Sequence, residues 1–131
     1  MPESHNIEYK SNWRNDYLKW ICGFANSKGG RLYVGVDDNG NVIGINNYKQ
    51  LLEELPNTFR DVLGIYAEVN LQNDNDKYYL EIVVPGYDVP ISLRGKYYIR
   101  TGSTIQELKD PVLCTDSRLA HSRLSRLIVG S

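Results

Sequence analysis

Four acidic residues are placed where they could act together on a phosphodiester: Glu3, Glu8, Asp37 and Asp38. Glu8 lies in a short alternating segment typical of a strand, and the two aspartates follow the next apolar strand. If those strands are neighbours, the carboxylates can converge, bind Mg²⁺ or Mn²⁺ and support an in-line displacement. The catalytic candidates are all four residues, and the metal-ligating candidates are Glu3, Glu8 and Asp37. An ordinary structural interpretation stays open, because Asp37-Asp38-Asn39-Gly40 is also a turn signal.

A second set of residues is basic or polar and includes the candidates for binding nucleic acid: Lys10, Asn26, Lys28, Arg31, Lys96, Arg100 and Ser103. Arg14, Arg94 and Thr104 belong to the same series, and Tyr97 and Tyr98 lie among them. Cations position phosphates, and tyrosine rings can stack on bases. The alternative is a solvated face beside core tyrosines, since successive strand residues point to opposite sides of a sheet.

The charge of the 131-residue chain is nearly balanced, with 15 basic and 16 acidic side chains and a net charge of −1. This balance argues against a simple, highly basic DNA-binding protein. The distribution is uneven, however: residues 1–36 carry +2, residues 37–93 carry −7 and residues 94–131 carry +4. A fold that brings the two ends to one face would create a local basic surface. We therefore expect Lys10 and Arg100 to share one face.

Several other chemistries lack the residues they need. There is no glycine-rich phosphate loop with a lysine and no dinucleotide-binding fingerprint. His5 and His121 have no cysteine or histidine partners for zinc, and Cys22 and Cys114 fit no metal spacing. No apolar run approaches the roughly 18 residues of a membrane span, and no secretory signal is recognisable. These features predict a cytoplasmic protein.

The hydrophobic pattern predicts an α+β domain with a two-layer mixed β-sheet and helices packed mainly on one face. The expected strands cover residues 7–10, 32–36, 42–45, 67–72, 78–84, 91–93 and 97–100, and the expected helices cover 17–25 and 48–63, with a break or kink at Pro56, and a short segment after Ser103. The helix between the first two strands permits them to pair in parallel. Thr104 and Glu107 have the spacing of a capping box, which is the reason for the last helix.

The expected core consists of Tyr17, Ile21 and Phe24 with the stripe Leu51, Leu55 and Phe59 on one sheet face. Val34 and Val36 should point to that same face, because strand side chains alternate.

Two blocks of the sequence closely resemble a known family. Glu3 and Glu8 with Tyr9-Lys10, and the long block from Phe24 to Gly44, resemble the Schlafen-type AlbA-like domain. The later segment from Tyr98 to Thr104 is similar to a third motif of that family, and Gly23 stands where the family often has alanine. The resemblance covers residues 3–109. We therefore expect residues 1–110 to form this domain and residues 111–131 to be a C-terminal helix or a non-native tail.

The resemblance implies a role with nucleic acid. Bacterial members are usually described as DNA-binding or transcriptional-regulator domains. In vertebrate Schlafens, two copies of the domain form a groove for structured RNA, and some members cleave it with carboxylates that match Glu3, Glu8 and Asp37 or Asp38. A single domain of this kind would need a homodimer to make an equivalent groove.

Three functions therefore compete. The first is a nucleic-acid-binding domain, for DNA or RNA, in a bacterial transcriptional regulator. The second is an endoribonuclease that depends on Mg²⁺ or Mn²⁺ and uses Glu3, Glu8 and Asp37 or Asp38. The third is a protein-interaction or dimerisation module that binds no nucleic acid.

Overall fold

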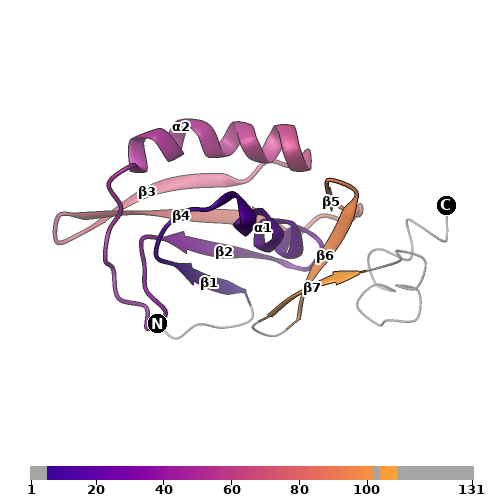
Figure 1. Ribbon diagram of the computed structural model, residues 1–131, viewed down its shortest axis with the longest axis horizontal. Coiled ribbons are helices and arrows are strands. Elements are labelled where there is room, and N and C mark those ends of the chain that lie inside the picture. The colour runs from indigo at the N-terminus through magenta and orange to yellow at the C-terminus, as the bar shows by residue number, and fades with distance from the viewer. Residues whose placement is uncertain (1–5, 102–103, 109–131) are drawn as a thin grey trace.

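A four-stranded mixed sheet forms the centre of the protein (Figure 1). The computed structural model describes residues 6–101 and 104–108. The strand order is β1-β2-β4-β3, with β1 at Ile7–Lys10, β2 at Gly29–Val34, β3 at Glu68–Asp74 and β4 at Lys77–Pro85. β1 and β2 are parallel, which the helix between them permits, and the other pairs are antiparallel.

The helices cover one face of this sheet. They are a 3₁₀ turn, η1, at Asn15–Tyr17, the helix α1 at Leu18–Ala25, the helix α2 at Tyr48–Thr58, and a π-helical turn, η2, at Phe59–Leu63. The main core lies between the helices and the sheet, and includes Ile21, Phe24, Leu32, Val34, Leu51, Leu55, Phe59, Leu80 and Ile82. This arrangement confirms the α+β fold with helices on one face. Tyr17 differs from the expectation, because its half-buried ring lies against Trp13 at the edge of that core.

A smaller antiparallel sheet also packs on α1. It contains β5 at Ser92–Leu93, β6 at Lys96–Thr101 and β7 at Thr104–Leu108. The helix α1 contacts strands of both sheets. Gly23 makes the close approach possible, since a β-carbon there would collide with the side chain of Ile105. α1 therefore joins the main sheet to the smaller one.

The helix predicted after Ser103 is wrong, because residues 104–108 form β7. Tyr97 to Thr101 pair with Leu108 to Thr104 in an antiparallel ladder. The Thr104 hydroxyl donates to the carbonyl of Thr101, 3.0 Å away, so it supports the hairpin. A capping box is only a local signal, and here the ladder with β6 and the packing on α1 outweigh it.

The expected common face of Val34 and Val36 is also wrong. Val34 belongs to the main core, whereas Val36 packs on the opposite side with Ile7 and Tyr9. Gly35, at φ +99°, lies between them, and the amides of Gly35 and Val36 both donate to the Lys10 carbonyl, at 2.7 and 3.2 Å. This arrangement has the character of a β-bulge, in which one extra residue reverses the alternation.

Two further segments differ in detail. The expected strand at residues 42–45 is reduced to a single bridge between Val36 and Val42. The helix α2 is not divided at Pro56 but continues to Thr58, and the wider π turn follows, ending at Gly64 with φ +71°. Pro56 lacks the N–H that an α-helix uses at this position, yet the helical winding continues past it.

No helix in the described part of the chain has the length and apolar character needed to cross a bilayer. The expected C-terminal segment at residues 111–131 lies outside the described residues, so the proposed boundary near residue 110 stays a prediction.

The Cys22 thiol gives a test of this packing. It is fully buried in α1 and donates to the Ile91 carbonyl, with Sγ 3.2 Å from the oxygen. Burial raises the pKa of Cys22 to about 11, so the reactive thiolate is scarce at mildly alkaline pH. In a Cys114→Ser variant, we expect a colorimetric thiol reagent to label Cys22 only after the addition of denaturant. Rapid labelling of the folded protein would contradict the burial of this helix face.

Candidate nucleic-acid interface

A groove with three basic side chains lies between the start of α1 and the β5–β6 hairpin. Its volume is about 390 Å³, and it is lined by Asn15, Asp16, Lys19, Leu93, Arg94, Lys96 and Tyr98. Three cations therefore face one carboxylate. Lys19 pairs with that carboxylate, Asp16, at 3.1 Å, while Arg94 and Lys96 are exposed. We refer to this feature as the basic groove.

The hairpin geometry is what brings two of these cations to the groove. Arg94 and Gly95 form a two-residue turn between Leu93 and Lys96, which pair with each other. Both turn residues have positive φ, 51° and 82°, as the tight turns of two-residue hairpins require. Because the turn is this short, Arg94 and Lys96 flank the same glycine at the tip of the hairpin.

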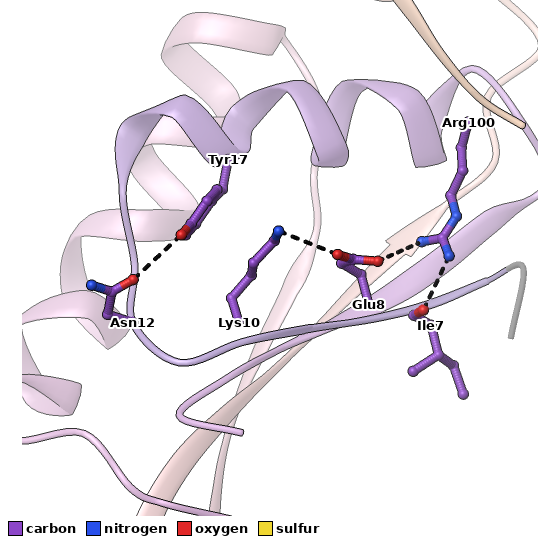
Figure 2. A network of polar contacts seen from close by, with 6 residues as sticks. All are labelled: Ile7, Glu8, Lys10, Asn12, Tyr17 and Arg100. Carbon is purple, nitrogen blue, oxygen red and sulfur yellow. Dashed lines mark hydrogen bonds and ion pairs between the residues drawn. The ribbon is translucent and has the colours of Figure 1, made fainter. Parts of the chain in front are cut away.

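A second polar cluster lies next to α1 and centres on Glu8 (Figure 2). Lys10 Nζ is 3.2 Å from Glu8 Oε2, and Arg100 Nη1 is 3.7 Å from Glu8 Oε1. Arg100 Nη2 also donates to the Ile7 carbonyl at 3.1 Å, which links β6 to β1. The structure thus brings Lys10 and Arg100 together, with a carboxylate between them.

Aromatic rings surround the two cations of this cluster. Lys10 Nζ lies 4.7 and 4.8 Å from the ring centres of Tyr17 and Trp20, and the Arg100 guanidinium lies 5.3 and 4.8 Å from those of Trp20 and Phe24. The side chain of Arg100 is only 2% exposed, whereas that of Lys10 is 19% exposed. Arg100 is therefore enclosed by the protein, and its charge interacts with Glu8 and aromatic faces.

The described carboxylates do not gather as a metal site. Glu8 is engaged with the two cations, and Asp37 Oδ1 accepts hydrogen bonds from the amides of Asn39 and Asn41, at 2.9 and 2.8 Å. Within residues 6–101 and 104–108, no three His, Cys, Asp or Glu side chains are grouped closely enough to hold a metal ion. Glu3 lies outside the described residues. The described donor set, Glu8 with Asp37 and Asp38, therefore does not fit Mg²⁺ or Mn²⁺.

The remaining sequence candidates are distributed over the molecule. Asn26 is buried after α1, with its side-chain amide bonded to the backbone of Ile91, just before β5, and of Tyr98 in β6. Lys28 is exposed in the turn before β2. Arg31 is exposed near Glu81, 3.8 Å away, on the sheet face opposite the helices, because Leu32 and Val34 face the core. Ser103 lies outside the described residues.

Sequence reasoning found Lys96 as a candidate, and it grouped Arg94 and Tyr98 with the basic series. It missed Lys19 altogether. Lys19 lies three residues after Asp16 and pairs with it, which is the pattern of an ordinary solvated helix face. What marks Lys19 as a candidate is its place in the groove with Arg94 and Lys96, and only the tertiary structure shows this.

The fold is similar to that of solved structures. The DIP2311 protein from Corynebacterium diphtheriae aligns with a TM-score of 0.66 and 18% identity over 87% of this chain, which spans only 24% of that protein. The N-terminal domain of a RecG-related protein from Nitrosomonas europaea, described as a candidate ATP-dependent DNA helicase, aligns with a TM-score of 0.59. Its identity is 28% over 81% of this chain and 84% of that domain.

No curated protein matches the chain in sequence. The family described as Schlafen, AlbA_2, matches residues 3–109, which is most of the chain and the same region as the motifs noted above. This chain belongs to the Schlafen AlbA_2 family.

Proposed function

We propose that this chain is a nucleic-acid-binding domain that holds the phosphate backbone in the basic groove. The observation that carries the proposal is the groove itself, in which Lys19, Arg94 and Lys96 converge from two elements beside Tyr98. Cations arranged in this way neutralise phosphates without reading sequence, so low sequence specificity is expected. The name of the Nitrosomonas europaea relative, which refers to a DNA helicase, supports an association with nucleic acid.

The basic groove also reconciles the proposal with the net charge of −1. Most of the acidic residues fall in residues 37–93, whereas the groove is built from residues 15–19 and 93–98. A local basic surface on a weakly acidic protein is sufficient for phosphate binding, because screening limits the reach of distant charges to about 10 Å at ordinary salt.

The proposal extends to a cytoplasmic, bacterial transcriptional regulator in which two copies of the domain form a larger groove. Light scattering of the purified chain, alone and with nucleic acid, tests the homodimer. If the particles contain a single copy of the chain both without nucleic acid and when bound to it, this part of the proposal is overturned.

Lys96→Ala tests the groove directly. With tRNA, single-stranded DNA and duplex DNA followed by fluorescence anisotropy, we expect weaker binding of the preferred ligand. The slope of log affinity against log salt should also fall by about one, because one phosphate contact is lost.

The matched control is Lys49→Ala, which removes another exposed lysine, in the first turn of α2 and outside the groove. Its affinity and salt slope should equal those of the unchanged protein. If neither variant alters binding, the groove is not the interface.

If no nucleic acid binds at all, the protein-interaction module becomes the better interpretation. Including Mn²⁺ and analysing the RNA on a gel tests the endoribonuclease alternative in the same experiment.

A further inference from the structure

We infer that Asn26 is a positioning residue for the basic groove, holding the β5–β6 hairpin in place from inside the protein. This inference rests on the proposed function of the groove. Asn26 directly follows α1 and is 1% exposed. The side chain of Asn26 is thus shielded from solvent. Its partners lie at least 65 residues further along the chain.

All the polar atoms of the Asn26 side chain bond to the hairpin segment. Nδ2 donates to the carbonyls of Ile91 and Tyr98, both at 2.8 Å, and Oδ1 accepts from the Ile91 amide at 2.7 Å. One side-chain amide therefore bonds both to the chain entering β5 and to the middle of β6. These two arms flank the turn at Arg94 and Gly95, and Lys96 directly follows that turn.

Alternative supports for the β5 arm are weaker, whereas β6 is also held by its ladder with β7. β5 has only two residues, and its ladder with β6 contains two residue pairs, Ser92 with Tyr97 and Leu93 with Lys96. Such a short ladder has little stability by itself. The Cys22 thiol reaches the Ile91 carbonyl at 3.2 Å, but a thiol is a weak donor. Within the described residues, the side chain of Asn26 thus ties the chain entering β5 to the end of α1, the helix that carries Lys19, by two hydrogen bonds and reaches β6 by a third.

Loss of this attachment should loosen the groove while the main sheet stays folded. In Asn26→Ala, we expect the Ile91 amide to exchange with deuterium at least about tenfold faster, whereas the amides of Leu80 and Ile82 in β4 stay protected. We expect nucleic-acid affinity to fall by about fivefold to tenfold, as the loss of positioning hydrogen bonds implies.

A double-mutant cycle separates positioning from direct contact. If Asn26 acts through the hairpin, Asn26→Ala should have much less effect on affinity in a Lys96→Ala chain than in the unchanged chain. Additive effects would mean that Asn26 acts independently of the hairpin cation and would overturn the inference. Ser27→Ala is the matched control, because the Ser27 hydroxyl bonds to the Gly23 carbonyl within the same helix end, at 2.8 Å. It should leave both affinity and Ile91 exchange unchanged.

Two further outcomes are decided by the same set of proteins. If Lys96→Ala does not weaken binding, the proposed groove is wrong, whereas Ile91 exchange in Asn26→Ala still shows whether Asn26 holds the hairpin. If Asn26→Ala unfolds the domain, Asn26→Asp replaces it. This variant keeps the acceptor for Ile91 but loses both donors, and protonation of the carboxyl at acid pH restores one. Its affinity relative to the unchanged chain should therefore recover as pH falls, and an unchanged ratio would overturn the inference.

Discussion

Phe24→Ala should lower the free energy of unfolding by about 3–5 kcal/mol, the usual cost of emptying a large buried aromatic site. Phe24 is fully buried near the end of α1, and it belongs to the main core. Its ring also packs so closely over Gly30 of β2 that a β-carbon there would collide with it, and its face lies 4.8 Å from the Arg100 guanidinium. Contacts with the sheet and with the polar cluster are therefore lost together.

Urea denaturation followed by tryptophan fluorescence measures this change. Tyr66→Ala is a suitable control, since the side chain of Tyr66 is 77% exposed and the same kind of truncation there should change stability by no more than about 0.5 kcal/mol. A loss below about 1 kcal/mol in Phe24→Ala would show that the ring does not sit in the packed layer between α1 and the sheet.

Glu8→Gln should also be strongly destabilising, by about 3 kcal/mol or more, because it removes the carboxylate that faces the buried Arg100 cation. The side chain of Arg100 is 2% exposed, so solvent cannot compensate for the lost charge there, whereas Lys10, at 19%, partly reaches solvent. Glutamine keeps the size of the side chain, and the effect is therefore electrostatic.

The comparison that isolates the ion pair is Glu8→Gln combined with Arg100→Met. The double variant should lose less stability than the sum of the two single variants, because the methionine removes the buried charge that Glu8 compensates. Glu53→Gln, in an exposed position on α2, should be close to neutral. If Glu8→Gln is as mild as Glu53→Gln, the cluster around Glu8 does not stabilise the fold.

The result for Glu8 also bears on the endoribonuclease alternative. A catalytic Glu8 would be expected to lose cleavage and keep RNA binding on conversion to glutamine. The contacts with Lys10 and Arg100 instead predict a loss of stability. Stability must therefore be measured before any loss of cleavage in Glu8→Gln is attributed to chemistry.

The sequence by itself determined most of the main sheet and its helices. β1, β2, β3 and β4 fall close to the expected strands, because alternation of apolar residues reflects which face of a strand is buried. The helical stripes that contain Phe24 and Phe59 likewise indicated the layer that faces the sheet. The helix between β1 and β2 permitted their parallel pairing without requiring it, and the long block from Phe24 to Gly44 indicated the family.

The tertiary structure decided what local signals leave open. Thr104 to Leu108 became a strand because a ladder with β6 was available, and Val36 changed face because of the bulge at Gly35. Asn26 and Arg100 are residue types common on binding surfaces, yet both are buried. Each bonds to backbone more than 60 residues away in the chain: Asn26 to Ile91 and Tyr98, and Arg100 to Ile7.

The basic groove has the same origin. Lys19 and Lys96 are 77 residues apart in the chain. Lys96 belongs to the basic series of the sequence, but the sequence around Lys19 does not mark it as functional. Both line the groove because α1 contacts strands of both sheets and the short turn at Arg94 and Gly95 places the hairpin tip beside the start of that helix. The spacing of apolar residues along the sequence indicates which side of a helix or strand is buried. The distance between two elements depends instead on packing across the whole core, which no local sequence pattern specifies.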